Sequence, residues 1–178
     1  MANMSRLASE KKLVIAGPFN KPADATWRGI FILDVASLDR AREIISTDPG
    51  IQSGVFIQEA HPFAASPALR RTFELEKKFN AARAANPTEP LTNIRAYVMM
   101  TATDGARAAV AIKASTLSTA LIFCGTHTDT RAGVFVLDFE SVAEVHALIA
   151  KEDIDLGPCV VDGWWSTTSL TGLAPAGR

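Results

Sequence analysis

The heptapeptide GIFILDV at residues 29–35 recurs as GVFVLDF at residues 133–139. Each copy begins with glycine, continues with four apolar residues and reaches an aspartate, and the copies are 104 residues apart (133 minus 29). Self-similarity at a fixed offset indicates a repeated unit, and this offset is longer than the roughly 20–50 residues of solenoid repeats. The sequence therefore predicts two copies of a small domain in one chain.

Around residues 29–35, apolar runs and turn signals predict the rest of the first copy. Residues 12–16 read as a strand stopped by Gly17-Pro18, and residues 27–35 as a central strand. Ser37 is a predicted N-cap for a helix over residues 38–47, which Asp48-Pro49-Gly50 should end. Residues 54–60 are predicted to form the last strand.

The second copy repeats this order and adds an opening strand. Strands are predicted over residues 117–124, 132–139 and 158–170, with a helix that starts at a capping box formed by Ser141 and Glu144. Ahead of them, residues 93–102 read as a strand and residues 105–113 as a helix, which gives the order βαββαβ. The first copy has no counterpart of that opening strand, so the chain starts inside the motif.

The two copies are joined by a predicted helix over residues 67–85 and a proline-containing loop over residues 86–90. We therefore expect an α+β fold with a first repeat at residues 1–65, a linker at 66–91 and a second repeat at 92–172.

Composition excludes several classes of partner. With 18 basic and 19 acidic residues the net charge is −1, and no basic stripe suggests a nucleic acid partner. There is no apolar run of the roughly 18 residues that a membrane span needs, and no secretory signal at the N-terminus. We expect a cytoplasmic protein whose two cysteines, Cys124 and Cys159, are reduced. No phosphate loop or zinc-ligand spacing is present, so no cofactor is expected.

Several motifs together resemble one known family. KLVIAGP at residues 12–18, the strand from Gly29, Asp48-Pro49, SGVF at residues 53–56 and HPF at residues 61–63 are similar to the YciI-like (YCII-related) domains. The likeness is specific over residues 11–63 and only skeletal over residues 93–168. It implies ferredoxin-like units that pair into a dimeric α/β barrel, here with both halves in one chain. The family's characterised members resemble small-molecule lyases or dehydrochlorinases.

The resemblance also implies a His–Asp pair, made of a histidine about 17 residues before the glycine of Gly-Pro and the aspartate of Asp-Pro. Asp48 retains that aspartate, whereas neither copy has the histidine: Ala108 stands at its place in the second copy. His61, at the end of a predicted strand, is the candidate replacement, and the predicted catalytic residues are Asp48 and His61. Each also has a structural interpretation, as a turn residue and as a strand terminus respectively.

The other candidate residues have weaker signals. His127 and Asp129 lie in a polar loop that binds a ligand or is simply solvated, and His146 reads as a surface residue of a helix. Trp164-Trp165 should place one indole in the core and the other on the opposite face. Asp34 and Asp138, at the ends of matching strands, either meet at the repeat interface or end their strands.

These observations leave two functions open. One is a small-molecule-binding or lyase-type enzyme with His–Asp acid–base chemistry. The other is a non-catalytic structural or interaction protein, whose missing strand leaves a sheet edge for a homodimer contact or for the helix over residues 67–85 to cover. Whether the protein is an enzyme at all is not decided by its residues.

Overall fold

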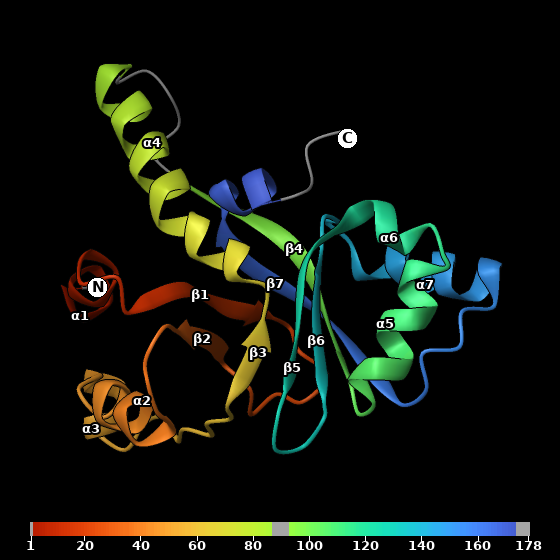
Figure 1. The fold of residues 1–178 in the computed structure, drawn as a ribbon, viewed down its shortest axis with the longest axis horizontal. Helices are drawn as coiled ribbons and strands as arrows, with labels where there is room; N and C mark the ends of the chain where they lie inside the picture. Colours follow the sequence, from red (N-terminus) through yellow and green to blue (C-terminus); the bar gives the residue numbers. More distant parts are fainter. Residues whose placement is uncertain (1, 87–92, 174–178) are drawn as a thin grey trace.

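Seven strands form one curled antiparallel sheet, a half-barrel, in the computed structural model, which describes residues 2–86 and 93–173 (Figure 1). The strands lie in the order β2 (Gly29–Leu33), β1 (Leu13–Asn20), β7 (Cys159–Thr167), β4 (Ile94–Ala102), β6 (Gly133–Leu137), β5 (Leu121–His127) and β3 (Phe63–Ala65). Strands of both predicted repeats thus share one sheet. Within the described chain, β2 and β3 are its two edges.

The described residues form nine helical segments beside the sheet. They are α1 (Ala2–Ser9), α2 (Leu38–Ile45), α3 (Pro49–Gln52), the 3-10 helix η1 (Pro67–Arg71), α4 (Thr72–Ala85), α5 (Gly105–Lys113), α6 (Leu117–Ala120), α7 (Val142–Glu152) and the 3-10 helix η2 (Thr168–Leu173). None of these described helices is long and apolar enough to cross a membrane.

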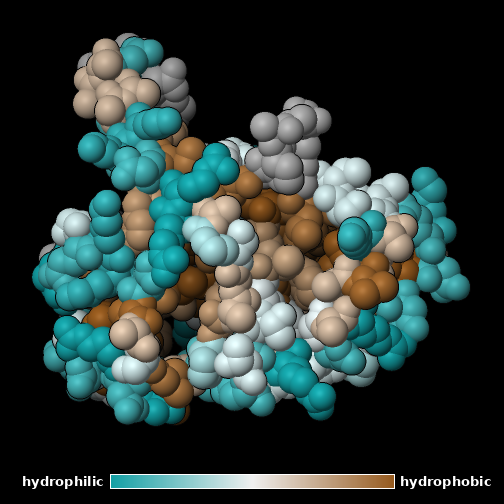
Figure 2. Space-filling model, in the orientation of Figure 1, coloured by the Kyte–Doolittle hydropathy of each residue, from teal (hydrophilic) through white to brown (hydrophobic). Residues whose placement is uncertain are grey.

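The core lies on both faces of β4, because alternate residues of a strand point to opposite faces. Tyr97 and Met99 belong to one buried cluster with Trp164 of β7. Val98 and Met100 belong to the other, which α5, α6 and α7 complete with residues such as Ile112, Leu117 and Val145. Figure 2 shows further apolar side chains at the surface, in the hollow between α4 and the half of the molecule that holds α5 to α7.

The two hairpins that contain the repeated heptapeptide have the same register. β1 and β2 pair Leu13 with Leu33 and Gly17 with Ile30, with an irregularity between Leu13 and Ile15. β5 and β6 pair Leu121 with Leu137 and Gly125 with Val134, with the irregularity at the equivalent place. The sequence repeat thus corresponds to a repeated local structure.

Strands β1 and β7 approach each other closely at Gly17 of β1. A Cβ atom on Gly17 would lie 2.0 Å from the carbonyl oxygen of Trp165. The indole Nε1 of buried Trp164 donates a hydrogen bond to the Gly17 carbonyl at 3.0 Å. As predicted, the two neighbouring indoles separate, since Trp165 keeps 39% of its surface exposed.

Some predicted elements are wrong in detail. Gly17-Pro18 does not end β1, which continues to Asn20 because it leaves β2 and pairs with β7 from Phe19. Residues 117–120 form α6, ahead of β5. Ser141 caps α7 without the side-chain hydrogen bond of a capping box.

The predicted strand over residues 54–60 is also wrong. This segment has irregular structure, because it has no neighbouring strand to pair with, and Ile57 is 98% exposed. The closed barrel of two ferredoxin-like repeats stays a prediction.

Candidate functional site

Two histidines and two carboxylates from distant parts of the sequence meet beside the β3–β5 pair. His61 lies just before β3, and His127 is the last residue of β5. Antiparallel pairing sets Phe63 opposite His127, and the amide of Thr128 donates to the carbonyl of Pro62 at 3.0 Å. These backbone contacts place His61 against the turn that follows β5, where Asp129 lies.

Both ring nitrogens of His61 have a carboxylate partner. Nδ1 lies 2.9 Å from Oδ2 of Asp129, and Nε2 lies 2.9 Å from Oε1 of Glu59. The His61 side chain is 24% exposed, whereas that of Glu59 is 77% exposed. Asp129, which comes from a distant turn, therefore fixes one side of the His61 ring. The exposed Glu59 carboxylate is the partner that a ligand can displace.

The His61 and His127 rings are stacked, with centroids 4.6 Å apart and planes 11° from parallel. Phe63 meets the His127 ring edge-on at 5.9 Å. A Cβ on Gly125 would lie 2.2 Å from the Phe63 ring, so the glycine makes room for the side chain that supports His127.

The environment moves the pKa values of the two histidines in opposite directions. Hydrogen bonds to Asp129 and then to Glu59 raise the pKa of His61. Burial lowers the pKa of His127, and the adjacent charge of His61 lowers it further. The hydrogen bond from His61 also lowers the pKa of Asp129. His61 is thus favoured as an imidazolium and His127 as a neutral imidazole.

The same side chains are donors suited to a metal ion. Ligand atoms of His61, His127 and Asp129 all lie within 4.8 Å of one another. Two imidazoles and a carboxylate are a common donor set for transition metals. A cation there would displace the proton between His61 and Asp129, so metal and proton compete for the site.

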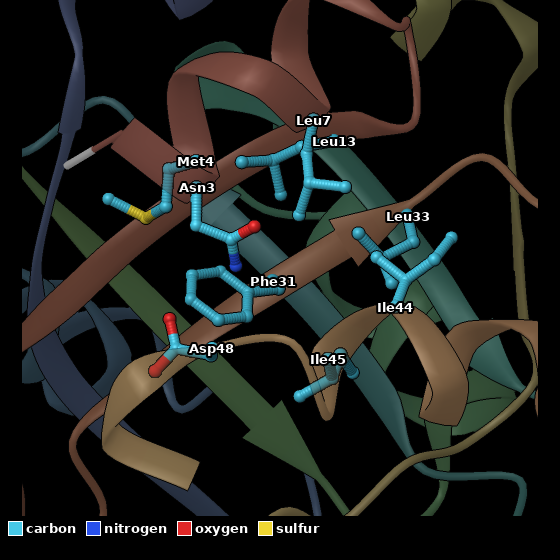
Figure 3. Close-up of a pocket in the computed structure, with 9 residues that line it drawn as sticks. All are labelled: Asn3, Met4, Leu7, Leu13, Phe31, Leu33, Ile44, Ile45 and Asp48. Atoms are coloured by element: carbon cyan, nitrogen blue, oxygen red, sulfur yellow. The ribbon is translucent and has the colours of Figure 1, made fainter. Parts of the chain in front are cut away.

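Asp48 lies elsewhere, at the start of α3. Its carboxylate accepts a hydrogen bond from the amide of Gly50 at 2.8 Å and caps the helix. It also lines a cavity of about 10 Å³ together with apolar side chains such as Phe31 and Ile45 (Figure 3). That volume barely admits one water molecule. Among the described residues no imidazole is hydrogen bonded to Asp48, and the structure shows no contact between Asp48 and His61.

The remaining candidates lie apart from the cluster. Asp34 makes a two-point ion pair with Arg70, and Asp138 pairs with Arg95, so the two aspartates do not meet. His146 is exposed on α7, as predicted.

A larger cavity of about 270 Å³ lies between α5, α6 and the β5–β6 hairpin. Its wall includes Ile112, Phe135 and Cys124, whose thiol has its pKa raised by burial.

The fold and the N-terminal motifs define a class of small α+β proteins with a curled antiparallel sheet. Within it, the family model of the YCII-related domain matches residues 1–63, which supports the likeness of this N-terminal segment to the YciI-like family. No curated protein and no solved structure matches the chain. The family match includes Asp48 and His61 and ends before His127 and Asp129.

Proposed function

We propose that this protein is a lyase-type enzyme for small molecules, with His61 as the general acid and His127 as the general base. The observation that carries the proposal is the stacked pair of imidazoles, of which only His61 is hydrogen bonded to carboxylates. Two titratable groups whose pKa values are pushed apart are suited to opposite roles in proton transfer. Asp129 would hold the His61 ring and its charge.

The chemistry that suits this pair is an elimination. Neutral His127 removes a proton from carbon, and the electrons of the C–H bond form a double bond as the bond to the leaving group breaks. A hydroxyl leaving group displaces the exposed Glu59 carboxylate, departs with its electron pair and takes a proton from Nε2 of His61, whereas a chloride departs as the anion and accepts a hydrogen bond from the same nitrogen. Every proton is accounted for by the two rings.

The test is a rate assay on a panel of β-chloro and β-hydroxy carboxylates, followed by the absorbance of the new double bond. We expect His127→Gln and His61→Gln to lower the rate by about 100-fold or more. The control His146→Gln, on the exposed face of α7, should leave it unchanged. Full activity of His127→Gln would refute the proposal.

The same assay separates the alternatives at the site. Asp48→Asn should keep its activity if the His61–His127 pair carries the chemistry, and lose it if Asp48 is catalytic. Loss of activity in a chelator, restored by zinc, would show that a bound metal replaces the proton of His61.

A non-catalytic interaction protein is the second candidate. The observation that favours it is the outer edge of β2, which no strand of residues 2–86 and 93–173 pairs with, because unpaired strand edges are templates for pairing. A homodimer is the simplest form of this function, and light scattering that shows a monomer would count against that form.

A further inference from the structure

One edge of the first hairpin has no strand partner among the described residues, and an exposed apolar segment follows α3. β2 pairs with β1 on one side and with no described strand on the other. Val55, Phe56 and Ile57 are 71%, 42% and 98% exposed. In the described part of the chain, the backbone from Ile57 to Ala60 makes no backbone hydrogen bond. Figure 1 shows this segment running from α3 towards β3, on the side of the molecule that carries β2.

The second hairpin shows what occupies the equivalent edge. Its strand β6 has the same register with β5 that β2 has with β1. The outer edge of β6, however, pairs with β4, from Val98 opposite Leu137 to Ala102 opposite Gly133. By the 104-residue offset, those β6 residues correspond to Leu33 and Gly29 of β2.

The other edge of β4 is also paired with a strand. It pairs along its whole length with β7, residues 159–167. The same offset maps β7 onto residues 55–63, which include the exposed apolar segment and lead into edge strand β3. The position equivalent to β4 therefore lies between the two edges of the seven-stranded sheet.

We infer that β2 and residues 55–60 form an acceptor site for one extended, mainly apolar β-strand that another polypeptide donates. The strand would add to the sheet by β-augmentation, pair with β2 on one side and residues 55–60 on the other, and close the sheet into a ring. This site lies outside the histidine cluster and goes beyond the proposed acid–base function.

The exposed apolar side chains of the acceptor site indicate that the donated strand is apolar. Phe31 of β2, Val55 and Ile57 are exposed apolar side chains, so a strand with apolar residues like those of β4 removes them from water. The donor must offer two free edges. β2 of a second copy does not, because its other edge is already bonded to β1.

The test uses a labelled peptide with the sequence of residues 94–102 (IRAYVMMTA) as a stand-in for the donor strand. Fluorescence anisotropy measures binding, and hydrogen exchange read by mass spectrometry locates it. We expect saturable binding with slowed amide exchange at residues 29–33 and 55–60. A peptide with proline at the positions of Val98 and Met100 should not bind, because proline donates no hydrogen bond.

Two variants of the protein test whether peptide binding depends on the acceptor site. Ile57→Lys places a charge in the acceptor and should weaken binding by roughly tenfold or more, since an unpaired charge is costly to bury. Val110→Lys changes an equally apolar side chain, 72% exposed on α5, and should leave binding unchanged. Both side chains are exposed, so both variants should unfold at the wild-type temperature.

Absence of wild-type binding at peptide concentrations up to about 1 mM would overturn the inference, as would equal binding of the proline peptide. Equal affinity in the Ile57→Lys variant would also overturn it. A different outcome is a dimer in light scattering, in which the β2 amides are already protected from exchange and the peptide does not bind. In that case a second copy of the chain, and not a donated strand, occupies the edge of β2.

Discussion

Gly17→Ala is the sharpest test of the fold, because it places a methyl group where β1 and β7 approach most closely. The new Cβ would lie 2.0 Å from the carbonyl oxygen of Trp165 and 2.8 Å from two indole atoms of Trp164. Non-bonded carbon contacts are comfortable at about 3.5–4.0 Å, so the backbones must separate by more than 1 Å. Neither neighbour is a flexible side-chain end that can turn away.

The cost has two parts. Overpacking a tight site typically costs about 1–3 kcal/mol. Separation of the strands also breaks the hydrogen bond from Trp164 to the Gly17 carbonyl, which contributes about 1 kcal/mol. We expect Gly17→Ala to lower the free energy of unfolding by about 3 kcal/mol, which is roughly 6–12 °C in the melting temperature of a domain this size.

Urea unfolding followed by tryptophan fluorescence measures this difference. Gly163→Ala is the matched control, because Gly163 lies in β7 where it pairs with β1. Its Cβ would lie 3.1 Å from the Asn20 carbonyl oxygen, so the backbone needs only a small shift. It should cost about 1 kcal/mol or less. If the free energy of unfolding of Gly17→Ala lies within about 0.5 kcal/mol of wild type, or if both variants lose the same amount, β1 and β7 do not approach as closely at Gly17 as the structure has them.

Three further variants test single contacts. Asp129→Asn should lower the pKa of His61 in an NMR titration, because its main charged partner is removed. Since that pKa is raised in the folded protein, the pair stabilises the fold fully below the ordinary value of about 6.5, and this contribution is lost as pH rises through the folded pKa. The variant should therefore lose more stability at pH 5 than at pH 9. An unchanged His61 titration would show that the Asp129 contact is absent in solution. Trp164→Phe should cost about 1–2 kcal/mol in urea unfolding, because the Gly17 carbonyl loses its buried donor. A cost near zero would show that water replaces the donor. Asp48→Ala should cost about 1 kcal/mol for loss of the α3 cap, whereas Asp48→Asn keeps the cap and should be neutral. Equal losses in the two would mean that the carboxylate charge itself matters.

Local signals in the sequence predicted most of the elements. The Ser37 N-cap makes its side-chain hydrogen bond to the amide of Arg40, and α2 follows where the apolar spacing sets it. The repeat at residues 29–35 and 133–139 corresponds to two strands in hairpins of equal register. These features depend on residues close in the chain, which is why they can be read from it.

The elements that the sequence predicted wrongly depend on residues far apart in the chain. Residues 54–60 have the composition of a strand, but a strand needs a hydrogen-bonded neighbour, and the described chain supplies none. Gly17-Pro18 has the composition of a turn that ends a strand. The glycine is instead required because β7, far away in sequence, lies so close that a Cβ atom would not fit. Long-range partners of this kind leave no local mark.

The site divides in the same way. His61 was predicted as a replacement histidine, and its hydrogen bond to Asp129 spans 68 residues. The sequence predicted His127 and Asp129 in one polar loop whose composition also fits solvation, whereas the structure has His127 as the last residue of β5 and Asp129 in the turn that follows. The expected partnership of His61 with Asp48 is not seen: the Asp48 carboxylate accepts from the amide of Gly50, and His61 is hydrogen bonded to Asp129 and Glu59.

By itself, the sequence determined the repeated hairpin, the α+β class and the likeness of residues 1–63 to the YCII-related domain, because repetition, apolar spacing and local caps act over short stretches of chain. Only the tertiary structure decided which groups meet. The pairing of β3 with β5 brings His61 to His127 and Asp129, and among the residues that the structure describes no strand pairs with the outer edge of β2, so the sheet stays open there. Both depend on strand pairing between residues far apart in the chain, and such pairing is set by the whole fold.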